Sequence, residues 1–175
     1  PRVMGFSSVP SRGVRRGQIV DINQVTSVVE QSVEKAERMA GTKVQAAYLS
    51  VGGPHIESIN SQCVVAVSQP DVEISEDDIL RVVDAAKAIS ISSTKEGIEV
   101  VPREYIVDGQ SGIKNPLNMS GVRLEVNTHI ITASQTNLKN LDRCLSDLGI
   151  EPIAYVFSGL SSALSTLSET EKELG

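Results

Sequence analysis

The chain contains few residues that could act as a nucleophile, a general base or a metal ligand. Its histidines are His55 and His129, and its cysteines are Cys63 and Cys144. His129 falls on the polar side of an alternating segment and His55 stands beside a turn, so both are predicted to be surface residues. The cysteines occupy apolar positions without the spacing of a zinc site, which favours small buried hydrophobic side chains. A disulfide between them is the alternative, whereas reduced cysteines suit a reducing cytoplasm.

Glycine and serine motifs that bind phosphate or carry a nucleophile are missing as well. The sequence has no G-x-x-x-x-G-K-[ST] and no G-x-G-x-x-G pattern. Gly52-Gly53 is the only glycine doublet and runs into Pro54, which favours a hinge or turn over a phosphate cradle. Ser158 opens a serine-rich segment that lacks the G-x-S-x-G elbow, and it is predicted to cap a helix. No constellation of residues supports a free-standing enzyme.

The charged residues give no support for a metal site or a nucleic-acid partner, and the apolar runs are too short for a membrane span. Glu73, Glu76, Asp77 and Asp78 stand at a predicted helix start, where the helix dipole favours negative charge without any ion. The net charge of −6 opposes binding to a phosphate backbone. No run approaches the ~18 apolar residues of a membrane span. We therefore expect no metal or cofactor in this chain, no nucleic-acid partner and no direct membrane contact.

The two ends of the chain share a mixed pattern of strands and helices. Strands are predicted at 3–9, 17–21 and 44–51, with a helix that starts at Asp21 or Asn23 and ends at Gly41. The later part shows an amphipathic helix through Leu138 and Leu145 that Gly149 closes, a strand at 150–157 and a final helix from Ser158. These segments are predicted to pair in one sheet.

The middle of the chain has the signature of an antiparallel sheet with one wet face. Extended segments are predicted at 56–67, 98–101, 104–107 and 122–132, with a turn at Asp108-Gly109. In the last of these, Val122, Leu124 and Val126 are expected to be buried, and Arg123 and Glu125 exposed. Ser75 and Asp78 form a capping-box pattern before a helix. The apolar face of that helix is predicted to consist of Ile79, Val83, Ala86 and Ile89.

The order of these elements predicts an α+β fold in two parts. Residues 1–52 and 149–175 would form one α/β unit, and residues 53–148 a second unit inserted between them. The chain would leave the first unit at Gly52-Gly53-Pro54 and return somewhere between Ala133 and Gly149. Insertions of this kind are tolerated where the two ends of a surface loop lie close together.

Five phrases spread over nearly the whole chain match one known family in order. They are Ser11 to Asp21 with Val33 to Glu37 in the helix that follows, Val51 to Ile56, Tyr105 to Asp108, Asn115 to Glu125, and Glu171 to Gly175. This pattern resembles the bacterial FtsA family of actin-like cell-division proteins. The resemblance implies part of an actin-like, ribonuclease-H-like α/β subdomain, interrupted by a small strand-helix-strand-strand domain. It also implies an internal fragment of a longer protein, which suits a chain that begins without Met inside a strand-like segment.

The function implied by the resemblance belongs to the longer protein. FtsA proteins link filaments of FtsZ to the cytoplasmic face of the inner membrane at the division septum. Their Mg-ATP would be held by phosphate loops before Pro1 and after Gly175, so this chain would carry no ATP chemistry. The inserted domain would contact neighbouring FtsA subunits and the basic tail of a late division protein, FtsN. FtsZ would bind through a region outside this chain.

Four charged residues are the candidates for partner binding. Glu99, Glu104, Arg123 and Glu125 fall on the predicted strands of the inserted unit, and their charges would steer a basic peptide. Solvated surface charge is the alternative interpretation of each. The alternative function for the chain is part of another actin-like ATPase, of pilus-assembly or chaperone type, that contributes to a nucleotide clamp.

Overall fold

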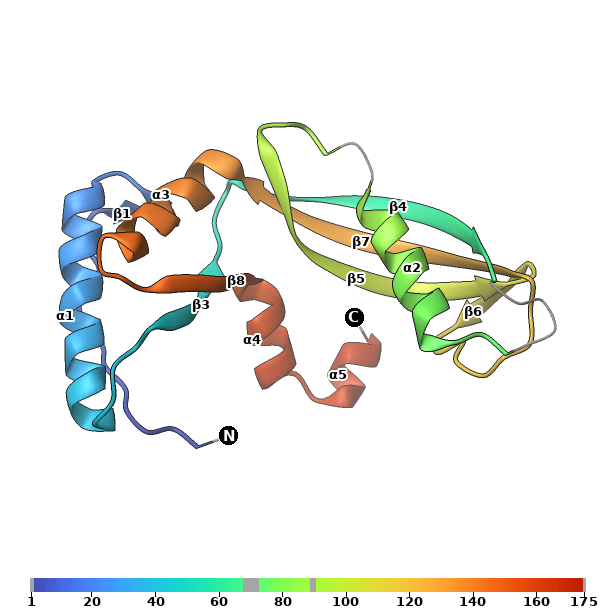
Figure 1. Ribbon diagram of the computed structural model, residues 1–175, viewed down its shortest axis with the longest axis horizontal. Coiled ribbons are helices and arrows are strands. Elements are labelled where there is room, and N and C mark those ends of the chain that lie inside the picture. The colour runs from blue at the N-terminus through green and yellow to red at the C-terminus, as the bar shows by residue number, and fades with distance from the viewer. Residues whose placement is uncertain (1, 68–72, 89–90, 175) are drawn as a thin grey trace. The chain divides into compact units, whose positions relative to one another are not determined.

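A computed structural model describes residues 2–67, 73–88 and 91–174 of the chain. The elements in chain order are β1 Val14–Arg15, β2 Gln18–Ile19, α1 Ile22–Ala40, β3 Ala46–Val51, β4 Ile56–Ala66, α2 Glu76–Lys87, β5 Lys95–Val107, β6 Gln110–Ile113, β7 Arg123–Ser134, α3 Gln135–Ser146, β8 Glu151–Phe157, α4 Ser158–Thr166 and α5 Glu169–Leu174. Figure 1 shows these elements. They form two compact units. The discontinuous unit contains Pro1–Ile56 and Ala133–Gly175, and the inserted unit contains Glu57–Thr132.

The discontinuous unit is built on two parallel strands, β3 and β8, paired from Ala46↔Glu151 to Val51↔Phe157. Helices α1 and α3 pack against each other and cover this pair with a core around Leu49, Leu145 and Ile150. Helix α1 begins as predicted, because Asp21 accepts a hydrogen bond from the Gln24 N–H at 3.0 Å. It ends at Gly41, whose φ of 71° suits a residue without a Cβ.

Three expectations for the discontinuous unit are wrong. The strand predicted at 17–21 does not join the sheet of β3 and β8, because β2 pairs with β1 in a separate two-stranded sheet. Residues 3–9 form no strand, and Val3, Met4 and Phe6 in this segment are exposed, because no strand of the described chain pairs with it. Ser158 is the first residue of α4 rather than its cap. The cap position belongs to Phe157, and no side chain caps this helix.

The inserted unit is a four-stranded sheet in the order β4-β7-β5-β6. Neighbouring strands run in opposite directions. For β4 and β7 this follows from two hydrogen bonds, from Val67 N–H to the Val122 carbonyl and from the Thr132 hydroxyl to the Glu57 carbonyl. For β7 and β5 it follows from the bond between Asp108 and Arg123 and the bond between Glu104 and Asn127. The fold class is therefore confirmed as α+β with an antiparallel sheet.

Helix α2 covers one face of this sheet and forms the main core of the inserted unit. The buried members of the core are Val67, Ile74, Val82, Ala86, Tyr105, Val107, Leu124 and Val126. Val82 is fully buried on the face of α2 that packs on the sheet, while the predicted Ile79 and Val83 are only partly buried. The predicted contribution of Ile89 lies outside the described residues.

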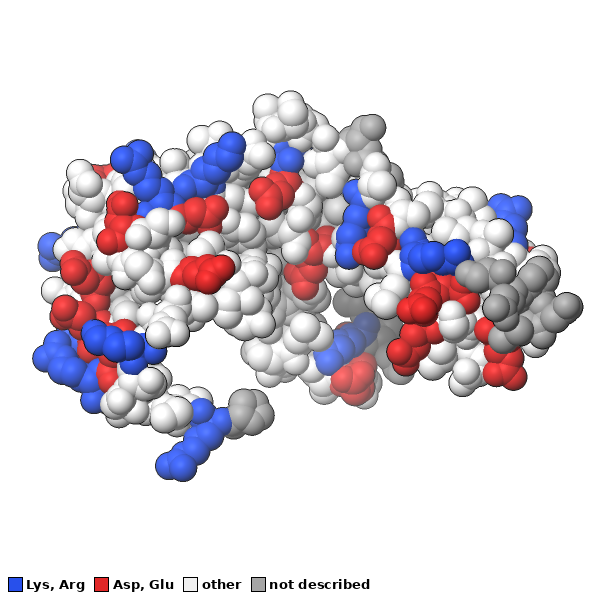
Figure 2. All heavy atoms as spheres, in the orientation of Figure 1, with Lys and Arg blue, Asp and Glu red and all other residues white. Residues whose placement is uncertain are grey.

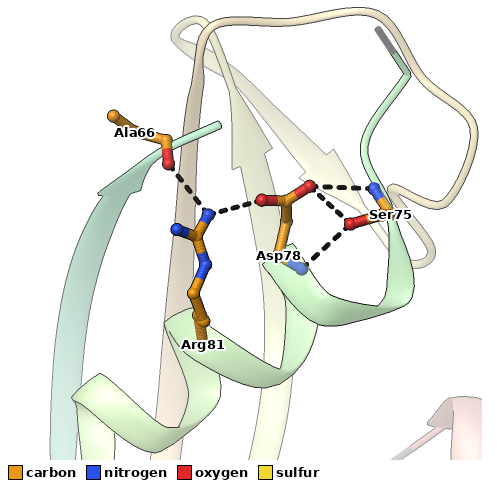
Figure 3. A network of polar contacts seen from close by, with 4 residues as sticks. All are labelled: Ala66, Ser75, Asp78 and Arg81. Carbon is orange, nitrogen blue, oxygen red and sulfur yellow. Dashed lines mark hydrogen bonds and ion pairs between the residues drawn. The ribbon is translucent and has the colours of Figure 1, made fainter. Parts of the chain in front are cut away.

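A network of polar contacts fixes the start of α2 (Figure 3). The predicted capping box forms, because Ser75 Oγ accepts from Asp78 N–H while the Asp78 carboxylate accepts from Ser75 N–H at 3.0 Å. Arg81 pairs with the other Asp78 oxygen and also donates to the Ala66 carbonyl at 3.1 Å. The buried Asp78 therefore caps α2 and pairs with Arg81, and Arg81 links the helix to the end of β4.

The burial pattern of β7 departs from expectation at two positions. Leu124 and Val126 are buried and Arg123 is exposed, as predicted. Val122, expected to be buried, is 54% exposed, because it precedes the strand and its N–H is held by the Asp108 carboxylate at the turn. Glu125, expected to be exposed, is buried, because neighbouring side chains cover it on the central strand.

The structure divides its two units at Thr132/Ala133, at the start of the range from Ala133 to Gly149 in which the return was expected. Strand β7 runs into α3 without a loop, and α3 packs on α1 within the discontinuous unit. Its Cys144 thiol lies 3.9 Å from the Ile22 carbonyl oxygen, and Leu145 joins the core around Leu49. The apolar face of α3 therefore belongs to the first unit, although the sequence alone favoured its place in the insert.

Candidate functional site

The face of the inserted sheet opposite α2 carries the polar side chains of three strands. Because side chains alternate along a strand, Arg123, Glu125, Asn127 and His129 of β7 share this face, while Leu124 and Val126 point toward α2. Strand β4 adds Asn60 and Gln62, and β5 adds Glu104, through hydrogen bonds to these β7 side chains. We call this surface the open face.

Glu104 is oriented by two donors on the open face. Its carboxylate accepts from the Asn127 amide at 2.9 Å and from the Gly112 N–H at 3.1 Å. Since Asn127 belongs to β7 and Gly112 to β6, the carboxylate joins both strands that flank β5. A half-buried carboxylate held in this way is pre-oriented and retains lone pairs for a donor from a partner.

Glu125 is more enclosed than Glu104. It accepts from the Gln62 amide at 3.1 Å, and Arg123 Nε lies 3.1 Å from its other oxygen. The Glu125 side chain is 11% exposed and that of Arg123 is 59% exposed. Arg123 is therefore the member of this pair that a partner can reach, and Glu125 holds it in place.

A hollow of about 520 Å³ lies on the open face beside Glu104. It is lined by polar residues, namely Asn60, Ser61, Gln62, Arg103, Glu104, Asn127 and Thr128. Amides, a carboxylate and a guanidinium together can accept and donate hydrogen bonds to an extended chain or to charged side chains. The lining contains no thiol and no imidazole side chain.

The fourth candidate, Glu99, belongs to a different surface. It lines a separate hollow with Val83 and Lys87 of α2, on the side of the sheet that the helix covers. The structure therefore brings Glu104, Arg123 and Glu125 together and leaves Glu99 apart from them. The sequence analysis missed Gln62 and Asn60, although both stand at alternate positions of 56–67 opposite the apolar Cys63, Val65 and Val67.

The histidines and cysteines assemble no metal site among the described residues. His129 Nδ1 lies 2.8 Å from the Asn60 side-chain oxygen, and both cysteines are free. His55 differs from the expected surface residue, because it is partly buried, and this desolvation lowers the pKa of its imidazole below 6.5. Its Nδ1 is buried without a hydrogen-bond partner in the described structure.

The glycine doublet forms a tight junction within the discontinuous unit. A Cβ on Gly17, in the β1–β2 turn, would lie 2.1 Å from the Gly52 carbonyl oxygen. A Cβ on Gly53 would lie 2.7 Å from the Arg16 carbonyl oxygen. The two backbones approach so closely that only residues without side chains fit, and the predicted turn at Gly52-Gly53 is also a packing contact.

Comparison with known proteins identifies the family. Residues 53–132 match the family described as the SHS2 domain inserted in FTSA. Over 173 residues, which is 99% of this chain, it is 40% identical to the cell division protein FtsA of Borreliella burgdorferi and 36% identical to that of Pseudomonas aeruginosa. The FtsA of Bacillus subtilis is 38% identical over the same length. The chain belongs to the FtsA family.

The chain corresponds to part of its FtsA relatives. It spans 41% of the Pseudomonas aeruginosa protein and 42% of the Borreliella burgdorferi protein. The SHS2 match covers the inserted unit, which holds the open face and the hollow beside Glu99. No helix in the described ranges of this FtsA segment is long and apolar enough to cross a membrane.

A solved structure supports the fold assignment for this FtsA segment. The PilM-PilN type IV pilus biogenesis complex matches with a TM-score of 0.54, covering 89% of this chain and 40% of the matched chain. The sequence identity is 12%, so this likeness shows the fold alone. The FtsA relatives, at 35–40% identity, carry the family assignment.

Proposed function

We propose that this chain is the part of an FtsA-type cell-division protein that makes protein–protein contacts through the open face of its inserted unit. The longer protein would link FtsZ filaments to the cytoplasmic face of the inner membrane at the septum. FtsZ would bind through a region outside this chain. Mg-ATP would be bound in the longer protein, and this chain would carry no ATP chemistry. The pre-oriented Glu104 beside the polar hollow is the observation that carries the proposal.

The distribution of charge favours a basic partner. Residues 57–132 contain 12 acidic and six basic residues, so the whole net charge of −6 lies in the inserted unit. The remainder of the chain, with ten of each, is neutral. On the face drawn in Figure 2, acidic side chains gather around the start of α2, where Glu76, Asp77 and Asp78 form the first turn. A field of one sign steers an oppositely charged segment toward the domain before contact.

The open face then supplies short-range contacts for such a segment. Glu104 offers a carboxylate whose direction is set by Asn127 and the Gly112 N–H, which reduces the entropy lost on binding. Gln62 and Asn60 offer amide groups in the same hollow. We propose that the occupant is a basic extended segment, such as the tail of an FtsN-like late division protein. We also propose that other surfaces of the inserted unit meet neighbouring FtsA subunits.

The decisive experiment compares charge reversals on the two sides of the sheet. Glu104→Lys should weaken binding of a fluorescently labelled basic FtsN-type tail peptide by about ten-fold or more, because a charge-assisted hydrogen bond is replaced by repulsion. Asp84→Lys changes the charge equally but stands on α2, with a side chain that is 65% exposed. It should weaken binding about two-fold, through steering alone.

Fluorescence anisotropy at low salt measures both affinities, and circular dichroism checks the fold. Glu104→Gln keeps an acceptor for the Gly112 N–H and serves if the reversal unfolds the domain. It should still weaken binding several-fold. Equal affinities for the wild type, Glu104→Gln and Asp84→Lys would remove the open face as the binding site.

A further inference from the structure

The two outer strands of the inserted sheet, β4 and β6, differ in how well their edges are protected. Strand β6 has only four residues and follows directly on the turn at Asp108-Gly109. Strand β4 has 11 residues, Ile56–Ala66, and no strand of the described chain pairs with its outer side. Its sequence lacks proline, lysine and arginine, the residues that commonly prevent an exposed edge from pairing. The outer edge of β4 is therefore open to another strand.

The backbone groups of β4 point alternately toward β7 and away from it. The Glu57 and Ser61 carbonyls accept hydrogen bonds from threonine hydroxyls of β7, at 3.2 and 3.3 Å. The Val67 N–H donates to the residue that precedes β7. Because alternate residues of an antiparallel strand bond to the same neighbour, the odd-numbered residues belong to this ladder. The even-numbered residues direct their N–H and C=O groups outward, namely Ser58, Asn60, Gln62 and Val64.

The last outward carbonyl of the strand is already occupied. The Ala66 carbonyl accepts a hydrogen bond from Arg81 of α2 at 3.1 Å (Figure 3). This contact agrees with the alternation and closes the edge where β4 ends. The outward groups that remain for a partner run from Ser58 to Val64, and the middle of this stretch is Ser61.

The stretch 58–64 can pair with a second copy of itself. When two identical antiparallel strands meet about a two-fold axis, each residue faces one that lies equally far on the other side of the axis. With the axis at Ser61, Asn60 faces Gln62 of the second copy. Ser58 then faces Val64, and each pair of outward residues exchanges two main-chain hydrogen bonds. One register therefore satisfies every outward group of the stretch.

The side chains are compatible in this register as well. Ile59, which is 37% exposed, faces Cys63 of the second copy, so that one apolar side chain meets another. Glu57 is the only charged residue of β4, and it faces Val65. Charges of the same sign therefore do not meet along the paired strands, and the sequence of β4 suits a second copy of itself.

We propose that two copies of this chain pair antiparallel through the outer edge of β4, about a two-fold axis at Ser61, and so join their inserted sheets. The pairing gives a defined surface to the contact between neighbouring FtsA subunits, and it rests on that part of the proposed function. It does not use Glu104 or the donors that orient it. Two joined edges bury less than the ~1,200 Å² of a standard interface, so the dimer should dissociate at about 100 μM.

Salt separates this pairing from binding of a basic partner to the open face. Each inserted unit carries the net charge of −6, so two copies repel each other at low salt. Raising the salt from about 50 mM to about 300 mM should strengthen the dimer, whereas it should weaken binding of a basic peptide. Glu104→Lys should dimerise at least as tightly as the wild type. Failure of one proposal is thus distinguishable from failure of the other.

The first arm of the test measures dimerisation of the full chain by sedimentation equilibrium. Val64→Pro removes an outward N–H without removing a bond to β7, and proline is tolerated at such a position of an edge strand. Because the two-fold axis repeats the loss, the dimer should weaken about ten-fold or more. Val64→Thr keeps the N–H and a branched side chain, and it should dimerise within about two-fold of the wild type. A folded Val64→Pro protein that dimerises like the wild type would overturn the proposal, as would a wild type that is monomeric at about 1 mM.

The second arm tests the register with a disulfide. Ile59→Cys places a thiol opposite Cys63 of the second copy, in a non-hydrogen-bonded pair whose Cα separation of about 4.5 Å suits a disulfide. Mild oxidation should give a covalent dimer that is lost when Cys63→Ser is added. A covalent dimer that persists without Cys63, or no covalent dimer at all, would contradict a two-fold axis at Ser61.

Hydrogen exchange of the wild type decides the question even if Val64→Pro does not fold. The amides of Asn60, Gln62 and Val64 should gain protection as the protein concentration rises through the dissociation constant. The amides of Ser61 and Cys63, which bond to β7, should be protected equally at every concentration. If the protection of Asn60, Gln62 and Val64 does not depend on concentration, the edge of β4 is not the dimer interface.

Discussion

Glu104 and Glu125 lie on the same face of one sheet, but their carboxylates differ in how accessible they are to a partner. Glu104 stands on β5 with two donors that leave part of its carboxylate open. Glu125 stands on the central strand, where Gln62 and Arg123 occupy its oxygens. Reversing Glu125 would place a cation in a buried position beside Arg123, which is costly in stability. Glu104 is therefore the residue at which binding can be tested with the least effect on folding.

His55 should make the stability of the chain depend on pH. Burial lowers the pKa of its imidazole below the ordinary 6.5, so the unfolded chain binds the proton more readily than the folded one. The contribution of His55 to stability is therefore fully present above pH 6.5 and is lost as the pH falls toward the folded-state pKa. An NMR titration of the His55 ring should give a pKa below 6.5.

The matched variant for this prediction is His55→Gln, which removes the titrating group. Urea unfolding of the two proteins should be measured between pH 5 and 7.5. As the pH is lowered, the free energy of unfolding should fall more steeply for the wild type than for the variant. Parallel pH profiles for the two proteins, or a ring pKa above 6.5, would contradict this account.

At the scale of elements, helix starts that depend on nearby residues could be predicted from the sequence. The packing partners of a strand or helix, which lie far away in the chain, could not. The start of α1 at Asp21 and the capping box of α2 depend on residues three positions apart, and both form as expected. The strand expected at 3–9 fails because a strand needs a neighbour, which its own residues do not reveal. The apolar face of α3 could be predicted from the spacing of its leucines. That spacing does not show which unit the helix packs against.

The candidate site shows the same limit. Alternation along 122–132 correctly grouped Arg123 and Glu125 on one face of the strand. The burial of Glu125 depends on Gln62, which stands 63 positions earlier in the chain. The separation of Glu99 from Glu104 depends on the position of α2 over the sheet. Contacts between distant segments therefore decided which charges share a surface.

The junction between the β1–β2 turn and Gly52 can be tested with two glycines of similar backbone conformation. Gly17 has φ 74° and meets Gly52, whereas Gly41 has φ 71° and no atom within 4 Å of a built Cβ. Gly41→Ala should cost about 1 kcal/mol through backbone strain alone. Gly17→Ala should cost about 3 kcal/mol or more, because the turn must also move away from Gly52. Urea unfolding measures both, and equal losses would show that the close contact contributes nothing.

At the scale of the molecule, the boundary between the two units also separates the acidic part of the chain from the neutral part. The chain crosses between the units twice, at 56/57 and 132/133. The inserted unit holds the entire net charge and both hollows discussed above, together with a core of its own. The discontinuous unit is neutral and keeps α3. A segment with a separate core and few chain crossings behaves as a folding unit.

We therefore predict that residues 53–134, which include the whole of β7, fold alone. The isolated segment should give dispersed amide resonances and a cooperative urea transition, because the core under α2 is contained within it. The longer segment 53–148 should have the same urea midpoint. Its added helix α3 buries Leu138, Cys144 and Leu145 in the intact chain, where it packs on α1, so it should be unstructured without the first unit. A segment 53–134 that stays unfolded while 53–148 folds would place α3 in the inserted unit after all, and with it the boundary near residue 149.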